Sequence, residues 1–311
     1  MSQSIANVGQ HLCVGITGTA LTPDTRRLLE TVRPGGVVLF SRNIDSPEQL
    51  RNFTRQLHDE LPVRPLIAID QENKRVNRLR FVMGELPGIA DIKQTGNAHD
   101  FGRQIGRALR DYGIDLDFAP VLDLETDADN ALRERCWGTT AAEVTRWAGE
   151  FIDGLQGENI LACAKHFPGL GGAQQDSHEL LPTITRSRDE LLAADVQPFV
   201  NLRDRLPLIM VSHGHYTAFD GKTPKPATLS SRIITDLLRN QLGFTGVVVT
   251  DDMEMGAIHD FTGAVVESVL AGADLVLVCH SPDKIMAAYE AFQKIKIPSE
   301  SSNRIQRLLH R

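Results

Sequence analysis

Cysteine, aromatic side chains and long apolar runs are all scarce in this chain of 311 residues. The four cysteines (Cys13, Cys136, Cys163 and Cys279) are widely spaced and form no C-x-x-C pair, which predicts buried free thiols and neither a disulfide nor a cysteine metal site. No apolar run approaches the ~20 residues that a membrane-spanning helix needs. Residues 1–10 lack the basic and apolar regions of a secretory signal, so we predict a cytoplasmic protein without a membrane partner.

Blocks of positive charge are also absent. The 33 Lys and Arg residues are outnumbered by 40 Asp and Glu residues, which gives a net charge of -7. Nucleic acids and anionic membranes bind clustered basic residues, so this balance predicts neither as a partner. Hydrophobic residues make up 41% of the chain, enough for the core of one large α/β domain or of two smaller ones.

Short apolar runs alternate with amphipathic stretches from end to end, which predicts alternating strands and helices. The expected strands are 11–17, 36–40, 66–70, 115–124, 160–166, 208–213, 246–251 and 273–279. The expected helices are 23–31, 47–61, 98–112, 141–155, 188–202, 231–242, 263–270, 283–295 and a terminal 301–311.

This alternation, without a linker or a shift in composition, predicts an α/β fold. We expect a single (β/α)₈ TIM-type barrel over residues 1–311, with no second domain. The alternative is a doubly wound sheet, which would need a glycine-rich phosphate turn after an early strand, and Gly15-x-x-Gly18 is too weak a match. Two loops, 71–97 and 167–186, are longer than a bare barrel needs, and such loops are usually functional.

Polar side chains stand where the expected strands end, the edge at which barrels of this kind carry their chemistry. For Arg42, Asp252 and His280 we expect only a capping role. The remaining residues combine acids, histidines, a lysine and arginines at consecutive strand ends, which indicates a single site. They are Asp70, Glu72, Arg75, Asp123, Arg133, Arg135, Lys165, His166, Asp176, His178, His213, His215 and Asp251.

Three chemistries could use these groups. A metal site could take His213-x-His215 with Asp251, but this H-x-H pair follows the sixth strand, so we expect a core or capping role for His213 and solvent exposure for His215. A Schiff-base aldolase could use Lys165, but the surrounding carboxylates favour a charged lysine. The third is sugar chemistry, with no metal and no cofactor.

For sugar chemistry the residue types divide into two sets. The long polar side chains suit the several hydroxyls of one ring; they are Asp70, Arg135, Lys165 and His166. Asp251 is then a carboxylate nucleophile, and His178 is a proton donor held by Asp176.

Seven segments, taken in order, resemble glycoside hydrolase family 3, in particular its single-domain β-N-acetylglucosaminidases of the NagZ type. They are 38–44 (V-L-F-S-R-N-I), 69–72 (I-D-Q-E), 118–123 (F-A-P-V-L-D), 165–169 (K-H-F-P-G), 176–178 (D-S-H), 226–230 (P-A-T-L-S) and 243–253 (G-F-x-G-V-V-V-x-D-D-M). The resemblance covers nearly the whole chain, and K-H-F-P-G followed by D-S-H is its most specific part.

The resemblance implies a retaining β-N-acetylglucosaminidase with Asp251 as nucleophile, His178 as acid/base and Asp176 as its orienting partner. Four residues would bind the terminal N-acetylglucosamine: Asp70, Arg135, Lys165 and His166. The implied substrates are small carbohydrates or cytoplasmic muropeptides, from which the enzyme releases N-acetylglucosamine linked to 1,6-anhydro-N-acetylmuramic acid in peptidoglycan recycling. We expect a monomer.

A histidine suits the role of proton donor, since its free pKa of about 6.5 lies near working pH and a neighbouring carboxylate favours its protonated form. Unlike a second carboxylate, it leaves no fixed negative charge to repel an anionic acceptor. One alternative is therefore a phosphorylase that transfers the sugar to phosphate. The other is a non-catalytic homologue that binds a sugar or muropeptide.

The chain departs from the family pattern at three places. After K-H-F-P the family usually has G-H-G-D, whereas residues 169–172 read G-L-G-G. The usual E-G-G-R is E-N-K-R at residues 72–75, and the arginine segment at 132–138 reads L-R-E-R-C-W-G. We expect these changes to affect rate, loop closure and aglycone preference more than the class of reaction.

Overall fold

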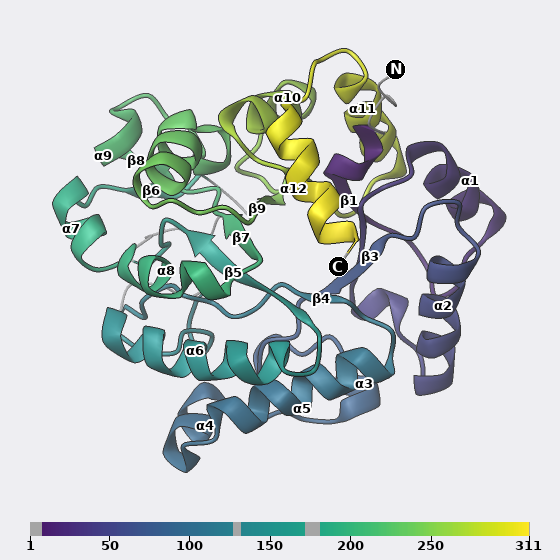
Figure 1. Cartoon of the computed structure of the whole chain (residues 1–311), viewed down its shortest axis with the longest axis horizontal. Helices are drawn as coiled ribbons and strands as arrows, with labels where there is room; N and C mark the ends of the chain where they lie inside the picture. The colour runs from purple at the N-terminus through teal and green to yellow at the C-terminus, as the bar shows by residue number, and fades with distance from the viewer. Residues whose placement is uncertain (1–7, 127–131, 172–180, 311) are drawn as a thin grey trace.

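A closed barrel of eight parallel strands forms the centre of the computed structural model, which describes residues 8–126, 132–171 and 181–310 (Figure 1). Around the barrel the strands follow one another in the order β1-β10-β9-β7-β5-β4-β3-β2. They are β1 (Leu12–Gly15), β2 (Gly36–Leu39), β3 (Leu66–Ile69), β4 (Leu116–Asp117), β5 (Leu161–Phe167), β7 (Leu208–Val211), β9 (Val247–Asp252) and β10 (Leu275–Val278). The predicted (β/α)₈ architecture is confirmed, and so are all eight expected strands.

The prediction was wrong about the length of β4, which ends at Asp117 and does not continue to residue 124. Beyond it the chain still pairs with β5, but irregularly: Lys165 N–H donates to the Pro120 carbonyl and Leu122 N–H to the Lys165 carbonyl. Pro120 has no N–H to contribute to a regular ladder. A second, two-stranded sheet of β6 (Thr183–Ile184) and β8 (His215–Tyr216) was not predicted.

Helices surround the barrel, with α5 and α6 packed along one side of it (Figure 1). The α-helices are α1 (Pro23–Val32), α2 (Pro47–Asp59), α3 (Arg80–Met83), α4 (Ile89–Thr95), α5 (Ala98–Asp111), α6 (Ala141–Gln156), α7 (Arg188–Ala193), α8 (Gln197–Leu202), α9 (Thr217–Asp220), α10 (Phe261–Ala271), α11 (Pro282–Phe292) and α12 (Ser299–Leu309). The 3₁₀ segments are η1 (Val8–His11), η2 (Ser41–Asn43), η3 (Arg203–Arg205) and η4 (Ala227–Leu229), and η5 (Arg232–Gln241) is a π-helix.

Two helix predictions need correction. The expected helix 188–202 is two helices, α7 and α8, separated by a break at Ala194 to Val196. The long loop 71–97 contains α3 and α4, neither of which was predicted. Helix α4 buries Ile89 and Ile92 and packs against α5, whereas α3 has no buried residue.

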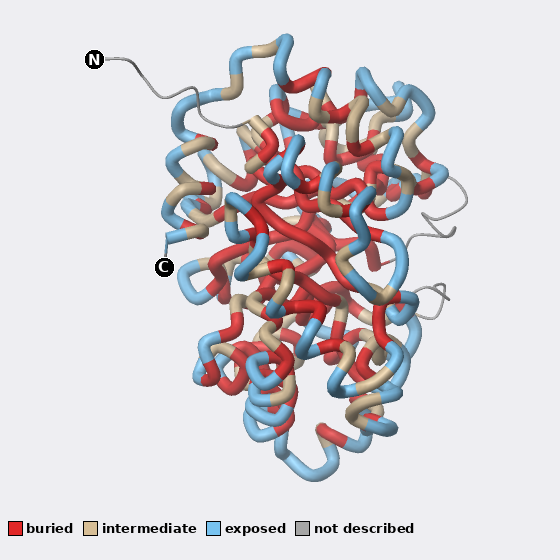
Figure 2. The backbone as a smooth tube through the Cα atoms, turned by 90° about the vertical axis from the view of Figure 1, so that its right-hand side faces the viewer, coloured by how far each residue is buried: buried red, intermediate tan, exposed pale blue. Residues whose placement is uncertain are grey.

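Buried residues gather in the middle of the molecule (Figure 2), and β1, β2, β7 and β10 are buried along their whole length. The side chains inside the barrel form one apolar cluster, to which α12 contributes Ile305 and Leu308. Helix α12 therefore closes the end of the barrel at which the strands begin. All four cysteines are buried and free, as predicted.

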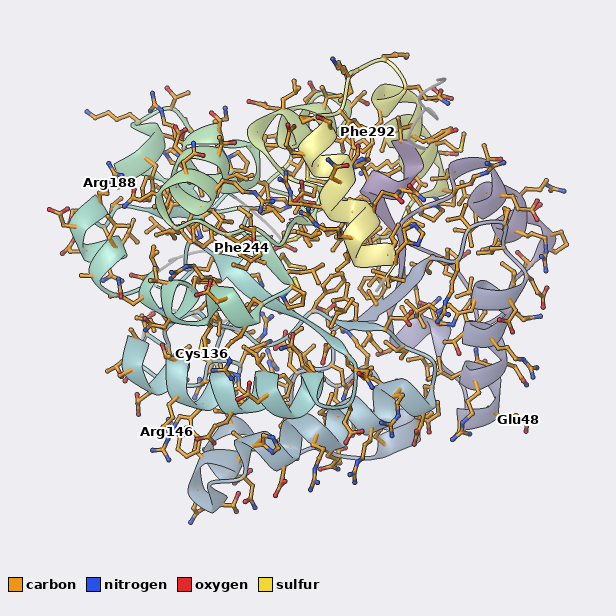
Figure 3. The ribbon with its side chains drawn as sticks, in the orientation of Figure 1. Glu48, Cys136, Arg146, Arg188, Phe244 and Phe292 are labelled. Carbon is orange, nitrogen blue, oxygen red and sulfur yellow. The ribbon has the colours of Figure 1, made fainter. Side chains whose placement is uncertain are left out.

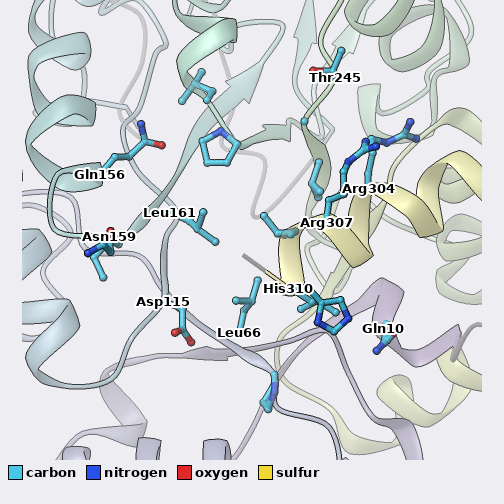
Figure 4. A pocket seen from close by; sticks show the side chains of 18 of the residues that line it. Gln10, Leu66, Asp115, Gln156, Asn159, Leu161, Thr245, Arg304, Arg307 and His310 are labelled. Carbon is cyan, nitrogen blue, oxygen red and sulfur yellow. The ribbon is translucent and has the colours of Figure 1, made fainter.

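A cavity of about 1860 Å³ opens at this same end, beside α12. Its walls include the first residues of three strands, Leu66, Leu161 and Val247. Arg304 and Arg307 reach it from α12, and Asp115 lies across from them (Figure 4). The cavity is thus at the opposite end of the barrel from the polar strand ends, and it is not the predicted site. None of the described helices is long and apolar enough to cross a membrane.

Candidate active site

Lys165 is the centre of a charged network at the C-terminal end of the barrel. Its Nζ lies 2.7 Å from Asp70 Oδ1 and 2.7 Å from Glu72 Oε1. On the other side of Glu72, Arg135 donates from Nε to Oε2 (2.9 Å) and from Nη2 to Oε1 (2.8 Å). The network therefore joins β3, β5 and the loop after β4, and it balances two carboxylates against two cations.

Burial and the paired charges shift the pKa values of this network in opposite directions. Burial by itself would raise the pKa of Glu72, but Arg135 and Lys165 outweigh it and hold that pKa well below its ordinary range. Burial would lower the pKa of Lys165, and Asp70 and Glu72 raise it on balance. Lys165 is consequently an ammonium ion and not an amine nucleophile, as expected from the sequence. Asp70, with 19% of its side chain exposed, is the most accessible member.

His166, the next residue on β5, is held by Asp123. Its Nδ1 lies 2.7 Å from Asp123 Oδ2, and its backbone N–H donates to the same oxygen at 3.2 Å. A carboxylate only accepts hydrogen bonds, so the Nδ1 proton is fixed on that side and Nε2 is directed elsewhere. The second oxygen of Asp123 accepts the Leu170 N–H at 2.6 Å. Asp123 thus positions both the imidazole and the start of the following loop.

Asp117 lies beneath this network, fully buried on β4. Its Oδ1 accepts a hydrogen bond at 2.9 Å from the backbone N–H of Gln71, the residue between Asp70 and Glu72 in the sequence. Its Oδ2 has no hydrogen-bond partner among the described residues. Burial raises the pKa of Asp117 well above the ordinary value, and the nearby carboxylates add to the rise. Lys165 and the Gln71 N–H oppose it without cancelling it.

Asp251 lies at the end of β9, at the same end of the barrel, and is partly buried. Its Oδ1 accepts the Asp252 N–H at 2.8 Å. Asp252 itself points to the neighbouring chain segments: Oδ1 accepts the Cys279 N–H, and Oδ2 lies 3.1 Å from His280 Nε2. Arg42 donates to the Cys279 carbonyl. Arg42, Asp252 and His280 therefore join strand ends, the structural role expected of them.

The two histidines of the H-x-H pair lie in the protein interior. His213 is buried and bonds Thr228 Oγ1 and the Asp252 carbonyl, each at 2.8 Å, which confirms its structural role. The expectation of solvent exposure was wrong for His215, which is 2% exposed. It belongs to β8, whose pairing with β6 covers it. Within the described ranges no three or more His, Cys, Asp or Glu side chains are placed to hold a metal ion.

The structure brings together five of the seven predicted site residues at one end of the barrel: Asp70, Arg135, Lys165, His166 and Asp251. Asp176 and His178 lie outside the described residues. The site also contains Glu72 and Asp123, which the sequence placed among the polar strand ends without assigning them a specific role. Both stand at strand ends beside predicted residues, and an excess of cations near one carboxylate could have indicated Glu72.

The loop that leads toward residues 176 and 178 is anchored at its start. Leu170 is buried in a small apolar cluster with Val121, Leu132 and Cys136. Where the family pattern has a polar histidine, this chain therefore places an apolar side chain in a matching apolar pocket. Tyr216 donates from its hydroxyl to the Gly169 carbonyl at 2.8 Å and fixes the same segment from β8.

Known proteins similar to this chain are glycoside hydrolases. A family model described as "Glycosyl hydrolase family 3 N terminal domain" matches residues 6–310. A Pseudomonas aeruginosa protein named beta-hexosaminidase is 34% identical over 306 residues, which cover 96% of this chain and 90% of that protein.

Solved structures show the same fold. The family 3 β-N-acetylglucosaminidase from Paenibacillus sp. superposes with a TM-score of 0.92 at 34% identity, over 100% of this chain and 62% of that one. This chain thus spans less than two thirds of the Paenibacillus structure. NagZ from Neisseria gonorrhoeae, in complex with N-trifluoroacetyl-D-glucosamine, gives 0.85 at 33% identity, over 95% of this chain and 88% of that one.

Proposed function

Because the chain belongs to glycosyl hydrolase family 3 and is a glycosidase, we propose that it is a retaining exo-β-N-acetylglucosaminidase. The observation that carries the proposal is the network of Lys165, Asp70, Glu72 and Arg135 at the C-terminal end of the barrel. It offers fixed donors and acceptors to the hydroxyls of one sugar ring. The two structural relatives named above support N-acetylglucosamine as that sugar.

In this proposal four residues bind the terminal sugar. Asp70 accepts hydrogen bonds from ring hydroxyls through its more accessible carboxylate, while Lys165 and Arg135 donate. His166 presents Nε2, since Asp123 occupies Nδ1. A site built from buried polar groups strongly favours a ligand whose hydroxyls form hydrogen bonds with those groups, because a ligand without them leaves the groups unpaired.

The chemistry proceeds in two displacements. A carboxylate oxygen of Asp251 attacks the anomeric carbon, and the bond to the leaving oxygen breaks as His178 donates a proton to it. Water then attacks the glycosyl-enzyme, His178 takes its proton, and the Asp251 ester is released with net retention. Asp176 orients His178 and favours its protonated form. The chain's residues supply all of these groups without a cofactor.

We propose as natural substrates muropeptide fragments in the cytoplasm, from which the enzyme releases N-acetylglucosamine linked to 1,6-anhydro-N-acetylmuramic acid during peptidoglycan recycling. What supports this is the relatives' activity together with the seven matching segments. The enzyme acts as a monomer, which light scattering on the purified protein would test.

The test is hydrolysis of a chromogenic β-N-acetylglucosaminide, with the anomer of the released sugar followed by NMR. Asp251→Ala and His178→Ala should each reduce kcat by at least about 10³-fold. Asp283→Ala, an exposed aspartate of α11, serves as the control and should leave kcat unchanged. Full activity of Asp251→Ala would eliminate the nucleophile assignment.

Product analysis in phosphate buffer separates the alternatives. Free N-acetylglucosamine as the only sugar product supports the hydrolase, and N-acetylglucosamine 1-phosphate would make the protein a phosphorylase. Binding of N-acetylglucosamine without any turnover would make it a non-catalytic sugar-binding protein.

A further inference from the structure

The end of β9 is paired irregularly with β10. Val249 lies opposite Leu275, and the next paired residues are Asp252 and Leu277, so β9 has one residue more than β10 between the two pairs. Asp251 is one of the β9 residues in this interval. The extra residue makes a β-bulge, a feature that re-aims side chains and is frequent beside active sites.

On its other side β9, which follows Phe244 in the chain (Figure 3), keeps a regular register with β7 as far as Thr250. Val247 and Val249 belong to the apolar cluster inside the barrel. Successive side chains of a strand point to opposite faces, so Asp251 follows these valines on the interior face. A shift of the strand by one residue would turn Asp251 away from the interior. The register at this end of β9 therefore decides where the nucleophile of the proposed reaction points.

Two side chains of β9 take the place of backbone acceptors at the bulge. Thr250 Oγ1 accepts the Leu277 N–H at 3.0 Å, and Asp252 Oδ1 accepts the Cys279 N–H at 3.3 Å. In a regular parallel ladder such N–H groups bind backbone carbonyls of the neighbouring strand. Thr250 and Leu277 are both buried, so loss of the threonine hydroxyl would leave this N–H unpaired.

His213 holds the same end of β9 from the opposite side. It follows β7, is fully buried, and its Nε2 lies 2.8 Å from the Asp252 carbonyl. Because a carbonyl only accepts hydrogen bonds, Nε2 is the donor. Nδ1 lies 2.8 Å from Thr228 Oγ1, a second contact that orients the ring. Asp252 in turn donates its N–H to Asp251 Oδ1 at 2.8 Å, so the hold of His213 reaches the nucleophile through one residue.

We propose that Thr250 and His213 are positioning residues, which fix the bulged end of β9 so that a carboxylate oxygen of Asp251 faces the anomeric carbon of the bound sugar. The inference rests on the proposed function and deepens it, because it names what aims the nucleophile. Neither side chain contacts the sugar, so both act on the rate of the chemical step and not on ground-state binding. A reacting group misplaced by about 1 Å can slow a reaction by about 10²-fold.

Kinetics on a chromogenic β-N-acetylglucosaminide separate these two effects. Thr250→Val keeps the shape of the side chain without its oxygen, and should lower kcat at least about tenfold while KM changes by less than about twofold. Thr250→Ser keeps the oxygen, and its kcat should stay within about threefold of the parent value. Thr54→Val removes another buried threonine hydroxyl, on α2, and is the matched control that should leave kcat unchanged.

Variants of His213 give the same test at a second position, and they decide the question if Thr250→Val does not fold. His213→Leu removes the donor to the Asp252 carbonyl and should lower kcat at least about tenfold with little change in KM. The side-chain amide of His213→Gln can still donate to this carbonyl and should retain more of the parent activity. Unchanged kcat in Thr250→Val and His213→Leu would overturn the inference, and so would losses confined to KM.

Calorimetry separates this inference from the proposed function, because it measures binding without turnover. The probes are N-acetylglucosamine and its analogue with a ring ammonium in place of the ring oxygen, which carries the positive charge of the transition state. Asp251→Ala should bind the ammonium analogue at least about tenfold more weakly than the parent does. Equal binding by Asp251→Ala and the parent would contradict the nucleophile of the proposed function.

Thr250→Val should share the loss of affinity for the ammonium analogue, with N-acetylglucosamine bound within about twofold of the parent affinity. Parent-like affinity of Thr250→Val for both probes, beside a loss in Asp251→Ala, would overturn the positioning role and leave the glycosidase proposal intact.

Discussion

Glu72 is the residue on which the charged network depends, although its side chain is almost fully buried and has little direct access to a ligand. Its carboxylate contacts both Lys165 and Arg135. Removing one partner from a buried ion pair leaves an uncompensated charge, which costs more than the pair contributes. Glu72 therefore matters more for the shape of the site than its position suggests.

Glu72→Gln should lower the free energy of unfolding by about 3 kcal/mol at neutral pH, because Lys165 and Arg135 then lose the charge of the carboxylate that they share. Urea denaturation at 25 °C measures this. The control is Glu85→Gln in the same long loop, whose exposed pair with Arg80 should contribute less than about 1 kcal/mol. A change in Glu72→Gln as small as in the control would contradict the proposed role.

Asp117 gives a second prediction at this scale. Burial raises its pKa, which favours the protonated form in the folded protein, so Asp117→Asn resembles that form and should change stability by less than about 1 kcal/mol below about pH 4, where the unfolded carboxyl is also protonated. Asp117→Ala removes the acceptor of the Gln71 N–H and leaves a void, at a cost of about 3 kcal/mol. Thermal unfolding of both variants distinguishes them.

The pH dependence of Asp117 has a fixed sign. For a carboxyl whose pKa is raised by folding, the stability due to the bound proton is present at low pH and is lost as pH rises through the folded-state pKa. Asp117→Asn should therefore gain stability relative to the parent as the pH is raised above about 4, the ordinary pKa of the unfolded carboxyl. A relative loss of stability would show that Asp117 is ionised.

Among the helices, the clearest departure from the local sequence pattern is the break between α7 and α8, where one continuous helix was expected. Asp195, at the break, is fully buried against Gly169 and forms an ion pair with Arg186. The contacts of Asp195 join Gly169 and Gly171, before residues 172–180, to Arg186, after them.

Burial raises the pKa of Asp195 to about 6, and Arg186 opposes the rise without cancelling it. Its contribution to stability is greatest below pH 4 and falls as the pH rises from 4 to 6. Asp195→Asn has no such titration, so its stability relative to the parent should rise by roughly 3 kcal/mol between pH 4 and pH 7.

Urea midpoints across that pH range measure the difference. Asp189→Asn, an exposed aspartate on α7, is the control and should follow the pH dependence of the parent. Parallel curves for Asp195→Asn and the parent would show that Asp195 has an ordinary pKa in the folded protein.

At the scale of the whole molecule, α12 completes the barrel core. Ile305 and Leu308 pack among the side chains that fill the barrel interior, so the end of the chain contributes to the same cluster as β1. The helix also binds the rest of the fold through Arg304, which pairs with Asp274 at 2.8 Å. Helix and barrel should consequently unfold together.

Ile305→Ala should destabilise the protein by about 3 kcal/mol in a single cooperative transition, because it leaves a void at the closed end of the barrel. Circular dichroism and fluorescence during urea unfolding measure this, and their transitions should coincide. Glu300→Ala, near the exposed start of α12, should change stability by less than about 0.5 kcal/mol. Separate transitions would show that α12 unfolds independently.

The sequence alone determined the architecture and most of the polar strand ends. Eight apolar runs of strand length, separated by amphipathic helices, leave few folds that bury all of them, and their periodicity is local information. The same reasoning located Asp70, Lys165, His166 and Asp251, because parallel strands place their C-terminal ends together. It predicted too great a length for β4, because the irregular pairing around Pro120 ends the strand although the sequence stays apolar.

Only the tertiary structure decided what these residues do to one another. Glu72 sits between Lys165 and Arg135, Asp195 packs against Gly169 at the break between α7 and α8, and His215 is buried by a two-stranded sheet, all through partners far away in the chain. Burial and long-range charge fix a pKa, and neither is encoded in neighbouring residues. The residue types were therefore readable from the sequence, while their charge states and contacts came from the packing.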